Sequence, residues 1–268
     1  MKSLKIIRFT LRDHTRHKSF YAVLAIGVLL VLTLRGCYEG TYVVNGHRLN
    51  SVELAWHISL SAFHVICIAS MLIGVMLAMR FVRRDREDGA VIMILSRPVR
   101  RIEYVLSRVA GVWLVTALFM FLLHATIFLI TLTSAGGVLP GYLGASLIAS
   151  VNLLFLITLT VLLSLYLPDF VSGLVSIAVV GVSFISDSVQ QALQTELGQA
   201  VAPGIVDAKI ALWRILWPKA AALQFSAAAL IRQQAYINPW PLHPAINILI
   251  YLTVAGVLLI VRFQREEI

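Results

Sequence analysis

The sequence predicts an all-α integral membrane protein with six transmembrane helices, and three observations carry this prediction. Hydrophobic residues make up 59% of the 268 residues and charged residues only 13%, although a soluble surface needs about a quarter of its residues charged. The mean hydropathy is +0.88. Apolar stretches recur along the whole chain, and about 20 residues suffice for one bilayer crossing. We expect residues 1–268 to form a single transmembrane domain, with spans at 20–34, 54–81, 109–132, 142–165, 170–185 and 245–261.

An amphipathic helix is predicted at residues 1–19, before the first span. One helical face carries basic residues and the opposite face carries apolar ones, so the helix suits a membrane surface; the basic residues are Lys5, Arg8, Arg12 and Arg16. A cleaved signal peptide or lipoprotein signal is excluded because the basic region is too long, Arg35 precedes Gly36, and further spans follow.

Polar residues inside the predicted spans are expected to connect helices. His57, His64 and Cys67 share one face of the second span. A metal site there would need a carboxylate or histidine from another span, and none stands out, so we expect a polar helix interface. His124 is expected to bond to a neighbouring helix. In the fourth span, polar side chains can bond across helices or to their own backbone; they are Asn152, Thr158, Thr160 and Ser164.

Residues 187–244 are less hydrophobic and are predicted to be an external interfacial segment between the last two spans. Asp187 and Gln190 have the spacing of a capping box, which predicts a helix start at Asp187. The segment also contains Trp213 and Trp217, and tryptophan favours the membrane–water interface. Surface-lying or re-entrant helices are therefore expected here.

The basic residues predict the orientation of the chain. Sixteen of the 22 Lys and Arg residues fall on one side if both termini are cytoplasmic, as the positive-inside rule requires. A multi-pass protein of the cell inner (plasma) membrane is expected. The net charge of +9 does not indicate nucleic-acid binding, because the basic residues flank apolar segments.

One densely charged island interrupts the apolar sequence, at residues 83–101. Eleven of its nineteen residues are charged, glycine or proline, whereas Ala90 to Leu95 are apolar. A short amphipathic helix at a membrane surface satisfies both properties. Gly89 allows a bend after the second span, and Pro98 suits the first turn of the next helix. The pattern predicts helix, turn, helix.

This island resembles the cytoplasmic segment after the second span of type-2 (ABC-2) ABC transporter permeases. The resemblance rests on Arg-Glu-Asp-Gly-Ala, then Ser-Arg-Pro-Val-Arg-Arg six residues on, then Glu103-Tyr104 and Leu106, and on the layout of spans. It implies a coupling helix within residues 83–108 that docks on a separate ABC ATPase subunit, with permeases paired as a homodimer or heterodimer. The cofactors implied are ATP and Mg in that partner, with none in this chain.

The resemblance also implies roles for the island's residues. Arg86, Glu87 and Asp88 would make charge-assisted contacts with the ATPase, Gly89 would permit close approach, and the face from Ile92 to Leu95 would pack into its groove. Arg97 and Pro98 belong to the turn that follows. Arg100 and Arg101, together with Arg97, would contact the ATPase or anionic lipid headgroups.

The sequence lacks the residues of several enzyme classes. No glycine is followed by lysine, so the chain has no P-loop. Zinc-protease and hydrolase-elbow motifs are absent as well, and an intramembrane serine protease would need Ser146 or Ser183 beside a histidine of another span. No charged residue is expected well inside a span, which favours a hydrophobic or amphipathic substrate. The resemblance to ABC-2 permeases implies that this substrate is exported. The alternative is a non-transporting scaffold or signalling protein whose basic loop binds lipid or another partner.

Overall fold

The computed structural model describes residues 2–16, 18–38, 43–44, 47–48, 51–87, 100–134, 141–193, 216–233 and 235–265. The regular elements of this part of the chain are helices, apart from a minimal antiparallel hairpin in which Val43 pairs with Arg48 and Val44 with His47. Its elements are α1 (Lys2–Arg16), α2 (Lys18–Thr33), α3 (Arg35–Tyr38), β1 (Val43–Val44), β2 (His47–Arg48), α4 (Ser51–Glu87), α6 (Arg101–Ser134), α7 (Gly141–Ser164), α8 (Asp169–Leu193), α12 (Ala220–Arg232) and α13 (Pro244–Arg265).

Five of these helices are long and apolar enough to cross a membrane. The crossing stretches are Trp56–Met79, Arg101–Thr133, Gly141–Ser164, Asp169–Gln190 and Pro244–Arg265. The first expected span, 20–34, falls in α2, whose apolar part, Phe20–Thr33, is shorter than the others. The prediction of a multi-pass helical membrane protein is confirmed, and the described residues contain five candidate spans.

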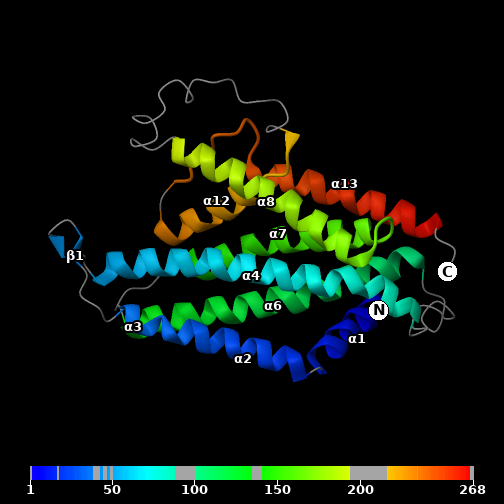
Figure 1. Ribbon diagram of the computed structural model, residues 1–268, viewed down its shortest axis with the longest axis horizontal. Coiled ribbons are helices and arrows are strands. Elements are labelled where there is room, and N and C mark those ends of the chain that lie inside the picture. The colour runs from blue at the N-terminus through cyan, green and yellow to red at the C-terminus, as the bar shows by residue number, and fades with distance from the viewer. Residues whose placement is uncertain are drawn as a thin grey trace.

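The long helices lie side by side along one axis (Figure 1). Helix α7 is in the middle and contacts α4, α6, α8, α12 and α13. Helix α1, the first turn of α6 and the last turn of α13 lie at one end of the bundle, here called the α1 end. Helix α12 lies in the opposite half.

Most polar residues of α7 bond within their own helix. Thr158, Thr160 and Ser164 donate to carbonyl oxygens of the preceding turn, at 2.7, 2.8 and 2.9 Å. Asn152 is different, because its Nδ2 donates to the carbonyl of Ala220 in α12 at 2.8 Å. The sequence predicted bonds across helices or to the helix's own backbone. The Asn152 amide bonds across helices, whereas these three hydroxyl groups bond to the backbone of α7.

The prediction of a helix start at Asp187 is wrong. Helix α8 runs unbroken from Asp169 to Leu193, so Asp187 lies inside it. Continuing the helix places Asp187 on a buried face, where it has partners from another segment. The fifth span was expected to end at Ile185 because Asp187 resembled a capping residue. This end is too early, since the helix continues to Leu193.

Helix α12 lies against the first three turns of α7. A Cβ on Gly141, the first residue of α7, would collide with the carbonyl of Leu230 near the end of α12. Eleven residues further along α7, about 16 Å at 1.5 Å per residue, Asn152 bonds to the start of α12. The helix ends at Gln233, whose left-handed conformation (φ 54°) returns its N–H to the carbonyls of Ala229 and Leu230.

Candidate functional site

Helix α4 is a single uninterrupted helix of 37 residues. At 1.5 Å per residue it is about 55 Å long, well beyond the hydrocarbon core of about 30 Å. Its last turn contains Arg86 and Glu87, the first of the predicted coupling residues. One rigid element therefore joins the membrane interior to the start of the coupling segment.

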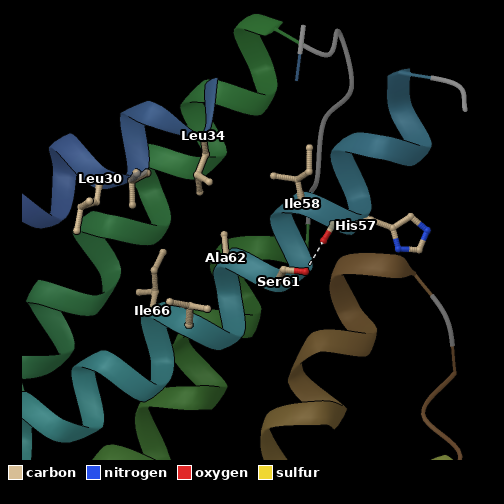
Figure 2. Close-up of a pocket in the computed structure, with 9 residues that line it drawn as sticks. Leu30, Leu34, His57, Ile58, Ser61, Ala62 and Ile66 are labelled. Atoms are coloured by element: carbon tan, nitrogen blue, oxygen red, sulfur yellow. Dashed lines mark hydrogen bonds between the residues drawn. The ribbon is translucent and has the colours of Figure 1, made fainter. Parts of the chain in front are cut away.

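An apolar groove of about 520 Å³ lies along the other half of α4. Figure 2 shows Leu30 of α2 and Leu34, in the turn just after α2, facing Ile58, Ala62 and Ile66 on α4. The described residues that line it are Leu30, Val31, Leu34, His57, Ile58, Ser61, Ala62, Val65 and Ile66. This set of residues is here called the α2–α4 groove.

The polar residues of the α2–α4 groove contribute little to its chemistry. The hydroxyl of Ser61 donates to the carbonyl of His57, one turn earlier, at 3.0 Å. The His57 ring turns away from the space between the two helices (Figure 2). The groove can therefore accept hydrocarbon, whereas a charged ligand would find no partner among the side chains that line it.

The coupling residues that follow Glu87 lie outside the described residues; they are Asp88, Gly89, Ile92, Leu95, Arg97 and Pro98. Arg86 and Glu87 are described only as part of the helix. The structure resumes at Arg100, which is exposed, and Arg101 begins α6.

Contacts between α6 and α13 organise the α1 end. Arg101 Nη1 donates to the carbonyl of Gln264 at 3.2 Å, where the unpaired carbonyls at the end of a helix favour a cation. Behind this bond, the buried rings of Tyr104 and Phe263 stack with centroids 6.0 Å apart. The first turn of α6 is thereby held against the last turn of α13.

Helix α1 packs closely against α6. Arg108 is buried, and its Nη1 donates to Thr10 Oγ1 at 2.9 Å. A Cβ on Gly111, one turn further along α6, would lie 2.6 Å from Thr10 Cβ, so the close crossing depends on glycine at this position. Our assignment of Arg108 to a cytoplasmic coupling segment missed this role, which is to attach α1 to α6.

A buried ion pair lies in the opposite half of the bundle. Asp187 of α8 and Lys219, just before α12, are each only 2% exposed, and Lys219 Nζ lies 3.5 Å from Asp187 Oδ1. The Lys219 ammonium also lies 3.1 Å from the centroid of the Trp240 ring, a cation–π arrangement. Asp187 is among the last four residues of the candidate span Asp169–Gln190, so this buried charge lies near the end of the span.

The same cluster satisfies the backbone at the start of α12. The first N–H groups of a helix lack partners within the helix. Here Asp187 Oδ2 accepts from the Ala222 N–H at 3.0 Å, and Ser183 Oγ accepts from the Ala221 N–H at 3.2 Å. Asn247 of α13 accepts from the Lys219 N–H at 2.8 Å. Asp187 is thus a capping residue, but it caps a helix that begins more than thirty residues later.

The two histidines inside the bundle form bonds between helices. His124 Nδ1 lies 2.8 Å from Ser146 Oγ of α7, as expected for a lone histidine in a span. Ser146 is fully buried and His124 stacks on Phe63, so this pair offers no substrate access to a nucleophile. His64 Nδ1 lies 2.8 Å from Gln224 Nε2 of α12. Among the described residues, no three His, Cys, Asp or Glu side chains group as metal ligands would.

Comparison with known proteins adds an independent observation. A family model described as ABC-2 family transporter protein matches residues 54–205, more than half of the chain. The matched stretch begins in α4, beside the α2–α4 groove, and includes the charged island together with α6, α7 and α8. No curated protein matches the sequence.

Proposed function

Because the chain belongs to the ABC-2 transporter family, we propose that it couples ATP hydrolysis by a separate ATPase subunit to the export of a hydrophobic or amphipathic substrate. Members of this family are the membrane-spanning permeases of their transporters, and this chain is a multi-pass membrane permease. The energy source, the direction and the substrate are the parts that we propose.

The observation that carries this proposal is the continuity of α4. Ile66, at one end of the α2–α4 groove, precedes Glu87 by 21 residues of the same helix, about 30 Å. A push on the end of α4 would displace the groove wall, because a continuous helix resists bending. The groove's apolar lining supports a hydrophobic or amphipathic substrate.

The proposed topology has six spans, with α2 as the first and both termini on the cytoplasmic side of the inner membrane. The α1 end then faces the cytoplasm, and α1 lies in the interface as the proposed interfacial helix. Of the expected external segment 187–244, residues 187–193 belong to α8. The rest of that segment remains assigned to the external side, with α12 as a re-entrant helix. Its 13 residues reach about 20 Å, too short to cross the hydrocarbon core.

The proposed coupling helix lies in the segment between α4 and α6. Arg86, Glu87 and Asp88 would bind charged groups of the ATPase, and Gly89 would allow close approach. Ile92 and Leu95 would fill an apolar groove of the partner, with Arg97 and Pro98 in the turn. Arg100 is exposed and is assigned to the ATPase or to anionic lipid, with Arg101 beside it.

The proposed assembly contains two permeases, identical or similar, above two ATPase subunits that bind ATP and Mg. The coupled motion would be the closure of the ATPase dimer, which pushes the coupling helices. The permeases supply the membrane path and no catalytic residue.

Co-purification with an ATPase tests this function. We would co-express the chain with ABC ATPases, purify the complex through a tag on the permease, and measure ATP hydrolysis. Glu87→Ala and Gly89→Trp should release the ATPase or uncouple its hydrolysis. Gly144→Trp is the matched control, because a Cβ on that glycine would have no atom of the described residues within 4 Å beyond its own neighbourhood in α7. If the intact permease retains no ATPase, the proposal is wrong and the scaffold alternative takes its place.

A further inference from the structure

The start of α12 is attached to three helices at one point. Asn152 of α7 binds the carbonyl of Ala220, Asp187 and Ser183 of α8 bind the next two N–H groups, and Asn247 of α13 binds the N–H of Lys219. The ion pair at the centre is buried, and removing one partner from such a pair leaves an uncompensated charge. These contacts are therefore costly to break one at a time.

The contact between α12 and α4 is of another kind. Gln224 Nε2 lies at hydrogen-bond distance, 2.8 Å, from His64 Nδ1, and the Phe225 ring meets the His64 ring edge to face, with centroids 5.4 Å apart. Gln224 Oε1 is buried without a partner among the described residues. Amide and imidazole can each donate or accept, so this bond can form again in a second position at little cost.

Helix α4 is also the element that the proposed mechanism requires to move. His64 lies between the groove-lining residues Ser61 and Val65 of the same helix. A displacement of α4 would therefore move His64 relative to Gln224 and change the shape of the α2–α4 groove at the same time.

From this difference we propose that the Asp187–Lys219 cluster fastens α12 to α7, α8 and α13 as one unit. Helix α4 moves against this unit at the His64–Gln224 contact and along α7, where the Tyr142 hydroxyl donates to the carbonyl of Ser59 at 3.1 Å. Asp187 and Lys219 are positioning residues in this mechanism, because they act through α12 and not on the substrate. This inference rests on the proposed function only for the movement of α4. The attachment of α12 does not depend on it.

Two cross-links distinguish the fixed contact from the moving one. In the complete transporter, with Cys37 and Cys67 replaced by Ser and Ala, one variant carries His64→Cys with Gln224→Cys. The matched variant carries Ser183→Cys with Ala221→Cys, within the fixed cluster. Each pair is joined by a short bifunctional methanethiosulfonate, and ATP hydrolysis is measured before linking, after linking and after reduction.

We expect the 64–224 link to lower the hydrolysis rate by at least about fivefold, since a blocked conformational step limits turnover, and reduction to restore it. The 183–221 link should leave the rate unchanged. Equal inhibition by both links would overturn the proposal, because α12 would then also move against α8. Full activity with the 64–224 link would overturn it as well.

A second experiment tests the attachment of α12 in the purified permease, without any ATPase. A negative result there can therefore be distinguished from failure of the proposed function. Asp187→Asn keeps an oxygen to accept from Ala222 but removes the charge, and Lys219→Met removes the opposite charge. Each single variant should lower the melting temperature of the purified permease by at least about 5 °C, and the double variant should recover most of this loss.

Thr160→Val is the control, because this buried hydroxyl bonds only to the carbonyl of Leu156 in its own helix among the described contacts; it should cost far less than either single variant. Melting temperatures that fall additively in the double variant would show that the two charges are not coupled and would contradict the fastening.

Discussion

The two halves of the bundle use charged residues in opposite ways. Around the start of α12, Asp187 and Lys219 are buried and pair with each other. At the α1 end, Arg100 is exposed and Arg101 bonds at the surface to the end of α13. Buried charges fix helices to one another, whereas the exposed Arg100 can meet a partner or lipid headgroups.

Arg108 refines this comparison, because it is a buried charge at the α1 end. It binds Thr10 of α1, and the Phe9 ring lies 5.9 Å from its guanidinium carbon. Whether a charge attaches helices therefore depends on its burial and not on the end of the bundle at which it lies. Each buried charge among the described residues, Arg108, Asp187 and Lys219, helps to attach one helix to another.

The largest expected effect concerns the close approach of α12 to α7. Gly141→Ala should lower the free energy of unfolding by about 3 kcal/mol, since the new Cβ meets the backbone carbonyl of Leu230 and neither helix can yield locally. Thermal unfolding in detergent measures this. Gly144→Ala, in the same helix but with nothing within 4 Å, should change stability by less than about 1 kcal/mol; equal losses would show that α12 is not held tightly there.

A smaller loss of stability is expected at Arg108, the buried charge at the α1 end. Arg108→Met keeps much of the side-chain volume but removes the hydrogen bond to Thr10, at a cost of about 2 kcal/mol. Limited proteolysis should then cleave α1 faster, because α1 loses its attachment to α6. Unchanged proteolysis of α1 would mean that packing around Gly111 suffices without the guanidinium.

The smallest effect on stability is expected at the exposed charge. Arg100→Ala should change the free energy of unfolding by no more than about 0.5 kcal/mol, because an exposed side chain loses few contacts. If Arg100 contacts the ATPase, the variant should nevertheless weaken co-purification, with a difference that narrows at high salt. If Arg100→Ala lowered the free energy of unfolding as much as Arg108→Met, the stated difference between buried and exposed charges would be wrong.

The sequence was sufficient to predict the helical membrane class and the family, because both depend on composition and on a local motif. The expected span at 142–165 corresponds to α7, Gly141–Ser164, where apolar residues run without a break. Asn152 was also recognised as a residue able to bind another helix, since an amide in a span needs a partner.

The sequence was insufficient where a residue's role depends on distant partners. Asp187 has the local pattern of a helix start, and only the packing of α12 shows that it caps another helix and pairs with Lys219. Its spacing from Ser183, one helical turn, is a signal that could have placed both on one face of a longer helix. The groove was missed for the same reason, because α2 and α4 form it together.

The central claim is that α4 connects the α2–α4 groove to the ATPase, and one comparison of hydrolysis rates tests it. Val65 lines the groove and is 65% exposed, whereas Met76 lies eleven residues further along α4, outside the groove, and is 63% exposed. In the assembled transporter, Val65→Trp should fill the groove and change the ATPase rate several-fold, about 33 Å from Glu87 along the helix. Met76→Trp should leave the rate unchanged. Equal rates in both variants would contradict the claim that the groove and the ATPase are connected through α4.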